Sequence, residues 1–227
     1  MLDGTFSPPC EGESAQIDSP FAQQAGTRKG LYNAFGKRLM DILLVMVSLP
    51  VTLPVILLVA LWIGKAPFYT QLRIGRGGRT FRLWKLRSMV RDADKVLDSY
   101  LAQDPARRKE WDLHQKLDQD PRITRIGHFI RKTSLDELPQ LWNVIRGDMS
   151  LVGPRPMMVG QQVLYPGTAY YRMRPGLTGS WQVSDRNAVS FSARAQFDED
   201  YCHRLSFAKD IGIILQTVRI VLRATGK

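Results

Sequence analysis

The chain has few of the residues that bind transition metals or cross-link a fold. Its 227 residues include only two cysteines, Cys10 and Cys202, and three histidines. The cysteines are far apart and no Cys-x-x-Cys pair occurs, so the sequence shows neither zinc-type ligand spacing nor a disulfide framework. We expect a reducing compartment, and a single disulfide between the two cysteines is the alternative.

Acidic residues are also scarce relative to basic ones. Lys and Arg together number 32 and Asp and Glu together 21, which gives a net charge of +11. Such an excess indicates an anionic partner, which can be nucleic acid, anionic lipid headgroups or a phosphorylated ligand. Aromatic residues are not interleaved with the basic clusters as base stacking requires, so we expect no nucleic acid partner.

The N-terminal segment lacks apolar periodicity. Residues 1–30 are rich in Ser, Pro, Gly and Gln, and such a composition buries too little apolar surface to fold. The segment also lacks the apolar centre of a secretory signal. We predict a disordered tail over residues 1–30, and the remaining length suits one folded unit better than two full domains.

A long uncharged run follows the tail. Residues 42–63 carry no charge, and this length is sufficient for a membrane-crossing helix, which needs about 20 residues. Pro50 and Pro54 interrupt its middle. Both flanks are basic, and this bias favours the cytoplasmic face for both ends. We therefore predict a re-entrant membrane helix within residues 31–66, broken at Ser48-Leu49-Pro50; the alternatives are a proline-kinked transmembrane helix and a buried core helix.

The next part of the chain alternates as strands do. Residues 68–87 predict two short strands around a glycine turn. On the second strand, Lys85 and Arg87 share one face by period-two spacing, which indicates either a cationic wall of a site or a solvated strand end. Helical patterns occupy residues 90–117 and recur around 126–130. The expected fold class is α+β, mainly helical with a small sheet.

The C-terminal segment carries an apolar stripe at helical spacing. The stripe consists of Ile211, Ile214, Leu215, Val218 and Leu222, with basic residues beside it. Such a helix is suited to the plane of a membrane interface. Packing on the protein core is an equally good interpretation.

Adjacent carboxylates mark the segment with the strongest chemical signal. Asp136 and Glu137 precede an apolar helical stripe and follow several cations. Ser134 and Glu137 fit a capping box, although Pro139 makes the helix start ambiguous between Ser134 and Asp136. In either register Asp136 lies at a helix N-terminus, which receives anions. The pair is therefore either a helix cap or a place where a carboxylate acts as a nucleophile, or holds a divalent metal, beside a phosphate.

Two proline-containing loops follow. Pro154 and Pro156 restrict the backbone of Arg155, so its guanidinium is suited to bidentate phosphate contact; an exposed loop arginine is the alternative. The second loop, residues 174–179, is a turn signal, and we expect a strand at residues 180–183 after it.

These residues resemble those of a known family, the bacterial sugar transferases, which are monotopic polyprenyl-phosphate phosphoglycosyl transferases. The similarity runs from about Lys37 to the C-terminus, and Phe68-Tyr69-Thr70-Gln71 departs from the arginine-containing pattern of many members. The matching runs are Ser48-Leu49-Pro50, Arg73-Ile74-Gly75, Trp84-Lys85-Leu86-Arg87-Ser88-Met89, Asp120-Pro121-Arg122, residues 130–141 with Leu-Asp-Glu-Leu-Pro-Gln, residues 147–156 with Gly-Pro-Arg-Pro, and residues 174–179.

The resemblance implies a reaction. Members start exopolysaccharide or other glycoconjugate synthesis by moving a hexose-1-phosphate from a UDP-hexose to polyprenyl (undecaprenyl) phosphate, with release of UMP. A covalent aspartyl intermediate and Mg²⁺ are implied, so Asp136 is the expected nucleophile and Asp136 and Glu137 the expected metal ligands. The cations expected to hold phosphates are Lys85, Arg87, Arg131 and Arg155.

The resemblance also implies a location and leaves alternatives. Residues 67–227 are expected to form a cytosolic catalytic domain on the cytoplasmic face of the bacterial inner membrane, against a bilayer with anionic headgroups. A non-enzymatic, basic, membrane-anchored scaffold protein is the rival from another class, and an enzyme acting on another lipid phosphate is a second rival. The sequence does not identify the sugar or the oligomeric state.

Overall fold

The computed structural model describes residues 31–114, 117–184 and 191–222. The predicted disorder of residues 1–30 lies outside this part of the chain, as does Cys10; Cys202 is a free thiol. The helices are α1 (Lys37–Ile63), α2 (Ala93–Ala102), α3 (Pro105–His114), α4 (Arg125–Lys132), α5 (Gln140–Arg146), α6 (Ala169–Arg172), α7 (Ser180–Val183), α8 (Arg194–His203) and α9 (Phe207–Leu222), and the strands are β1 (Phe68–Ile74), β2 (Thr80–Leu86), β3 (Ser150–Val152) and β4 (Gly176–Thr178).

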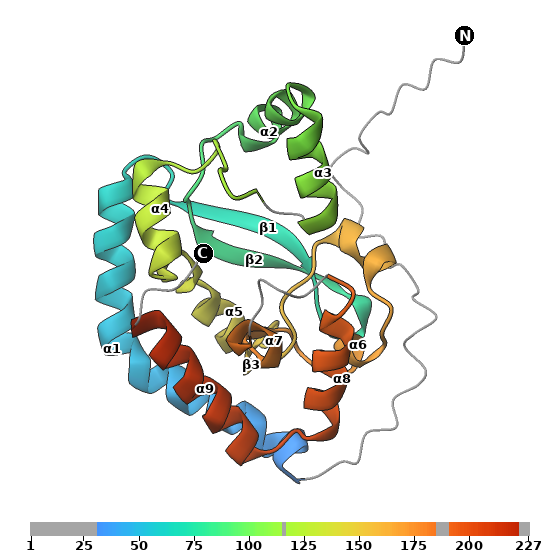
Figure 1. Cartoon of the computed structure of the whole chain (residues 1–227). Coiled ribbons are helices and arrows are strands. Elements are labelled where there is room, and N and C mark those ends of the chain that lie inside the picture. The colour runs from blue at the N-terminus through green and yellow to red at the C-terminus, as the bar shows by residue number, and fades with distance from the viewer. Residues whose placement is uncertain (1–30, 115–116, 185–190, 223–227) are drawn as a thin grey trace.

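The described residues confirm a mainly helical fold with little sheet (Figure 1). β1 and β2 form the predicted antiparallel hairpin, paired from Phe68 with Leu86 to Ile74 with Thr80. Its turn is a 3₁₀ turn in which Gly77 has a φ of 69°, a conformation that glycine adopts at little cost. β3 and β4 form a second, parallel pair. The strand predicted at residues 180–183 is wrong, because this segment is helix α7 and the strand precedes it.

The long apolar segment is one helix rather than two. α1 continues through Pro50 and Pro54, and it bends near its middle in Figure 1, as interior prolines require. The prediction of a break at Ser48-Leu49-Pro50 is therefore wrong at the level of secondary structure. The Ser48 hydroxyl donates to the carbonyl of Val45 at 2.8 Å, and the Thr52 hydroxyl donates to the carbonyl of Ser48 at 3.0 Å. These bonds tie the two turns around the bend together.

One side of α1 packs on the rest of the protein along both halves of the helix. Val45 is fully buried in a cluster with Leu83 and Val144, and Val59 is buried in a second cluster with Ile130. Near its start, Asp41 accepts a hydrogen bond from the backbone N–H of Leu151 at 3.0 Å. The opposite side is apolar and exposed, and comprises Leu39, Leu43, Met46, Val47, Val51, Leu53, Leu57, Leu58, Leu61 and Trp62.

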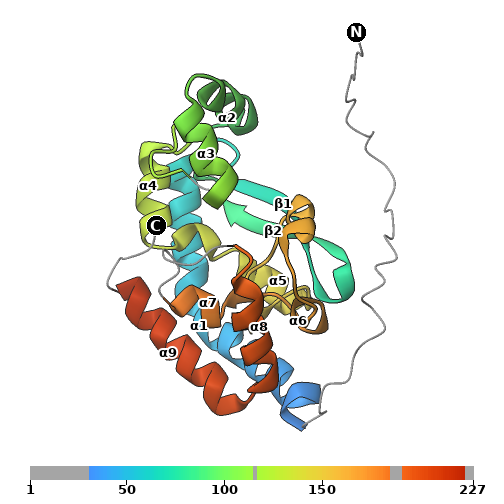
Figure 2. The ribbon, with the colours of Figure 1, turned by 45° about the vertical axis from the view of Figure 1, so that its right-hand side comes forward.

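Helix α9 also divides into a buried and an exposed side. Ile213 is buried with Val152 and Tyr201, and the fully buried Asp210 accepts hydrogen bonds from Lys37, Tyr201 and Tyr32 at 2.6–2.7 Å. These bonds place α9 beside the start of α1, as Figures 1 and 2 show. The exposed side carries Phe207, Leu215, Val218 and Val221. The helix therefore packs on the core and retains an apolar outer face.

Helix α4 is fixed to the end of β2. The side chain of Thr124 caps the helix by accepting from the N–H of Gly127 at 2.9 Å, and the N–H of Thr124 donates to the carbonyl of Ser88 at 3.0 Å. A Cβ atom at position 127 would lie 1.9 Å from that carbonyl oxygen. Only glycine allows this approach, which sets where α4 and the segment after it begin.

Gly127→Ala should destabilise the protein by about 1–3 kcal/mol, because the added methyl group forces α4 away from Ser88. Gly212→Ala in α9 is the matched control, since a Cβ atom there meets open space, and it should raise helix stability by up to about 1 kcal/mol. Thermal unfolding of the three proteins in one detergent measures both effects. Equal melting temperatures for Gly127→Ala and the parent would contradict the close approach.

Candidate active site

The two adjacent carboxylates lie in a tight turn between two helices. Ser134 has a φ of 57°, which is left-handed and ends the run of α4. Asp136 and Glu137 then occupy a 3₁₀ turn, Leu135–Glu137, and α5 begins only at Gln140. The Ser134 side chain makes no capping bond. The helical turns therefore begin after Ser134, one of the two predicted starts, but as a 3₁₀ turn that precedes the α-helix, and the capping-box interpretation of Glu137 is wrong.

Lys85 connects this turn to the hairpin. Its Nζ lies 2.8 Å from Oε1 of Glu137 and 3.6 Å from Oδ2 of Asp136. Leu83, two residues earlier and therefore on the same face of β2, is buried and lines the same cavity as Lys85. The alternation of the strand thus places Lys85 on the face of Leu83, where its ammonium meets the two carboxylates.

Asn143 holds β2 and α5 in register and was not recognised from the sequence. This fully buried side chain accepts from the N–H of Trp84 at 3.0 Å and donates to the carbonyl of Arg82 at 2.8 Å. The bonds are made to the two residues on either side of Leu83, just before Lys85 on β2, by the helix that follows Glu137. The buried Asn143 side chain thus satisfies backbone groups of β2 as a neighbouring strand would.

The environment of Asp136 opposes its ionisation. Asp136 is 7% exposed, and burial raises the pKa of its carboxyl group above the usual value near 3.8. The charge of Lys85 acts in the opposite direction and lowers this pKa, while Glu137 raises it and Arg131 and Arg155 lower it. A buried carboxylate among three cations is therefore the electrostatic centre of this region.

Two glycine-containing loops hold Arg155. The N–H of Gly153 donates to the carbonyl of Thr178, and the N–H of Gly176 donates to the carbonyl of Pro154, both at 2.8 Å. A Cβ atom at Gly176 would lie 2.1 Å from the backbone nitrogen of Gly153, so the two loops touch through their backbones. Nη2 of Arg155 consequently lies 3.8 Å from Oε1 of Glu137.

The structure brings some predicted cations to the carboxylates and not others. Arg87 turns to the base of the hairpin, where it donates to the carbonyls of Ala66 and Phe68. Arg131 acts on Asp136 through its charge. A surface cavity beside Glu137 is lined by Arg73, Leu83, Lys85, Glu137, Gln140, Arg155, Pro156, Gly176 and Leu177.

Arg73 and Gln140 are lining residues that the sequence did not single out as site residues. Arg73 donates to the carbonyl of Pro156 at 3.1 Å and to the side chain of Gln71 at 2.6 Å. Burial and the charge of Arg155 lower the pKa of Arg73 to about 10. Both residues lie inside the motif runs that carry the family resemblance, which was the available signal. The Gln71 position, where the chain departs from the family pattern, thus holds Arg73.

The oxygen ligands available to a metal ion are few. Within the described residues there is no group of three or more His, Cys, Asp or Glu side chains that could hold one. Asp136 and Glu137 offer two adjacent carboxylates. This set suits Mg²⁺, which proteins often bind through one or two carboxylates with water and substrate phosphates as the other ligands.

Comparison with known proteins gives one consistent result. The sequence model of a family described as bacterial sugar transferase matches residues 32–224. The chain is 48% identical over 197 residues to the UDP-galactose-lipid carrier transferase of Erwinia amylovora, and 46% identical over 199 residues to the undecaprenyl-phosphate galactose phosphotransferase of Salmonella typhimurium; each match covers 85% of this chain.

The lengths of the matched relatives differ. The chain spans only 41% of each of these two relatives. It is also 43% identical over 196 residues to the exopolysaccharide production protein ExoY of Sinorhizobium fredii, a match that covers 84% of this chain and 87% of that protein.

Proposed function

This chain belongs to the bacterial sugar transferase family, and we propose that it moves a hexose-1-phosphate from a UDP-hexose to undecaprenyl phosphate as the first step of exopolysaccharide or other glycoconjugate synthesis. The observation that carries the proposal is the nearly buried carboxylate of Asp136, flanked by Lys85 and by Glu137, at the edge of a cavity lined by arginines. The names of the relatives support the lipid phosphate acceptor and the sugar donor.

In the first step an oxygen of Asp136 attacks the sugar-bearing phosphorus of the UDP-hexose. A bond from this oxygen to phosphorus forms, and the bond from phosphorus to the bridging oxygen breaks, so that UMP leaves with the electron pair. In the second step a phosphate oxygen of undecaprenyl phosphate attacks the same phosphorus. The aspartyl bond breaks, the polyprenyl diphosphosugar forms and the carboxylate returns.

Lys85 controls access to the nucleophile. The residues that line the cavity include Glu137 and Lys85, whereas Asp136 is almost covered. The Lys85 ammonium holds both carboxylates, and a bound phosphate offers it a competing anion. We expect the Lys85 ammonium to move toward the phosphate when the donor binds, which frees an oxygen of Asp136 and leaves Glu137 to hold the turn.

Mg²⁺ is the proposed cofactor. Asp136 and Glu137 are the residues that would hold it, with the donor's phosphates as further ligands. When bound, the ion would neutralise charge on the transferred phosphoryl group. Arg155, which the paired prolines and the two glycine loops hold in place, supplies a fixed positive charge in the same region.

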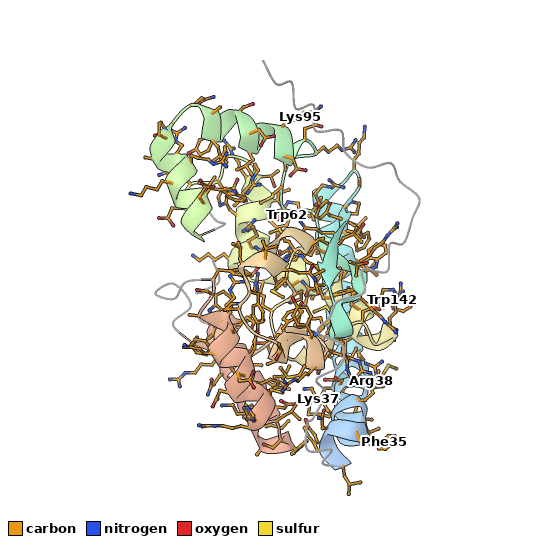
Figure 3. All side chains as sticks on the ribbon, turned by 90° about the vertical axis from the view of Figure 1, so that its right-hand side faces the viewer. Phe35, Lys37, Arg38, Trp62, Lys95 and Trp142 are labelled. Atoms are coloured by element: carbon orange, nitrogen blue, oxygen red, sulfur yellow. The ribbon has the colours of Figure 1, made fainter. Side chains whose placement is uncertain are left out.

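The apolar surface supports a location at the membrane. The helical run Tyr32–Ile63 is long and apolar enough to cross a bilayer, yet both of its halves pack on the same domain. Figure 3 labels Phe35 and Trp62 near its two ends. A crossing helix would pull the charged hairpin into lipid, so we propose that α1 enters and leaves by the cytoplasmic leaflet of the bacterial inner membrane.

Purified protein with Mg²⁺ and UDP-galactose should release UMP over many turnovers only when undecaprenyl phosphate is present in excess of enzyme. Asp136→Asn should lower kcat by about 10³-fold or more, because an amide is a poor nucleophile. Asp92→Asn, at an exposed position just before α2, is the control and should stay within a few-fold of the parent. Without lipid, a single stoichiometric burst of UMP is expected.

Two results would count against this assignment. Near-full activity of Asp136→Asn would exclude it as the nucleophile, and a parent that forms no UMP with any UDP-sugar would favour a non-enzymatic scaffold.

The pH dependence should follow the pKa of Asp136. Attack needs the ionised carboxylate, and burial raises this pKa, so kcat/KM should fall on acidification at a higher pH than for an ordinary aspartate. Lys85→Met removes the charge that lowers the pKa, so its acidic limb should lie at higher pH still. Lys95→Met is the control, since Lys95 lies at the opposite end of the molecule from Phe35 in Figure 3. An unshifted limb in Lys85→Met would contradict the assignment.

The topology can be tested with single cysteines at Asn33 and Lys65, which are exposed on either side of α1. In a background without the native cysteines, both positions should react with a membrane-impermeant maleimide in inverted vesicles and neither should react in intact spheroplasts. Labelling of one position from the periplasmic side would show a crossing helix instead.

A further inference from the structure

Three arginines interact beside the carboxylates. Arg73 and Arg155 line the cavity, and Arg194, the first residue of α8, is close enough for its charge to interact with both. The three charges act on one another, because the charge of Arg155 lowers the pKa of both Arg73 and Arg194, each to about 10, with burial as the larger cause. Arg155 is partly exposed, whereas the Nε atoms of Arg73 and Arg194 are buried; grouping these like charges in one cluster costs free energy that a bound anion would offset.

Arg194 is held in place by aromatic rings. Its guanidinium carbon lies 4.0 Å from the ring centre of Trp181 and 4.5 Å from that of Phe191. Within the described residues no hydrogen bond or ion pair of its guanidinium is found, and its buried Nε has no partner. The rings thus orient this arginine, while its Nε, one of the five donors of a guanidinium, has no acceptor among the described residues.

The guanidinium of Arg73 also has only some of its hydrogen-bond donors paired. Its two terminal nitrogens donate to Pro156 and Gln71, while its buried Nε has no hydrogen-bond partner among the described residues. These bonds fix the plane of the guanidinium beside the loop that carries Arg155. The geometry leaves donor positions for an acceptor that the described part of the chain does not supply.

The nearby carboxylates offset this charge only in part, Glu137 acting on Arg73 and Asp198 on Arg194. Glu137 lies 3.8 Å from Arg155 but 2.8 Å from Lys85, with which it is more closely paired. Asp198 is buried and accepts from the hydroxyl of Tyr165 at 2.8 Å, and burial raises the pKa of Asp198 to about 7. Burial thus opposes the ionisation that would let Asp198 balance Arg194.

The position of the cluster distinguishes between the two phosphate substrates. Leu135, beside the nucleophile, packs with Val59 of the membrane helix. On the other side, the neighbours of the arginines pack in a cluster built from β1, α6 and the segments around them. The members of this cluster are Ile74, Met157, Tyr165, Tyr170, Tyr171, Phe191 and Ala195. The arginines thus lie on the side of the carboxylates that faces away from the end of α1, which suits a water-soluble donor.

We propose that Arg73, Arg155 and Arg194 form a subsite for the phosphate of the departing nucleoside monophosphate. The inference rests on the proposed transferase function. When the bond from phosphorus to the bridging oxygen breaks, that oxygen keeps the electron pair and the nucleotide phosphate gains negative charge. Fixed guanidinium groups stabilise this charge where it develops, through short charge-assisted hydrogen bonds. Arg194 is a binding residue that the family motifs quoted above do not include.

Binding of UMP to the full-length protein in nanodiscs tests the subsite directly. By isothermal titration, Arg194→Gln should bind UMP about ten-fold or more weakly, the loss expected for one charged hydrogen-bonding group. Arg194→Lys keeps the charge, and its affinity for UMP should lie between those of the parent and Arg194→Gln. Arg172→Gln is the matched control, since Nε of Arg172 is also buried and without a partner among the described residues, and it should bind UMP as the parent does.

The other outcomes separate the two proposals. If Arg194→Gln melts at the parent's temperature and binds UMP equally tightly, the subsite is wrong. If Arg194→Gln weakens farnesyl phosphate binding and leaves UMP binding unchanged, the cluster takes the lipid phosphate and the subsite is again wrong. Arg194-dependent UMP binding without any sugar-phosphate transfer supports the subsite and overturns the transferase function. If Arg194→Gln unfolds, Arg73→Lys, which keeps the charge but loses the fork, should weaken UMP binding instead.

Discussion

The contact of the Lys85 ammonium with two adjacent carboxylates is the interaction on which this site depends. Asp136 is almost entirely buried, and a buried carboxylate is costly unless a cation lies close to it. Lys85 supplies that cation at 3.6 Å from Asp136 and 2.8 Å from Glu137. The unequal distances leave Asp136 the less tightly held of the two, which is the property that a nucleophile needs.

The surrounding structure keeps this contact in place with backbone bonds rather than with further charges. Asn143 joins the strand of Lys85 to the helix that follows Glu137. Gly127 lets α4 start against the end of the same strand, and Gly153 and Gly176 let the loop of Arg155 lie against its neighbour. Each of these contacts fixes the backbone that carries a charged side chain, and so reduces the conformational freedom of that side chain. The charged groups are therefore positioned before any substrate binds.

The sequence predicted the parts of this fold that have a local pattern. Period-two spacing predicted the hairpin and the face of β2 on which Lys85 lies. The prolines on both sides of Arg155 predicted a restricted backbone at that residue. It failed where local signals conflicted with tertiary contacts: the S-x-x-E pattern at Ser134 predicted a cap, whereas the left-handed Ser134 ends one helix before a separate turn. Arg194 and Asn143 had no recognised local signal, because Trp181 stacks on Arg194 and Trp84 bonds to Asn143 from more than ten residues away in sequence.

The bend in α1 connects this site to the membrane. A straight helix of this length would touch the domain at one end only, whereas the bent helix contributes Val45 to the cluster beneath Leu83 and Val59 to the cluster beside Leu135. Both clusters directly support residues next to the carboxylates. In the proposed membrane location, insertion of the outer face of α1 into lipid would fix the height of Asp136 above the bilayer, since the helix cannot shift without moving the core beneath the site. A lipid phosphate at the headgroup plane and a soluble nucleotide would then approach the same carboxylate from opposite sides.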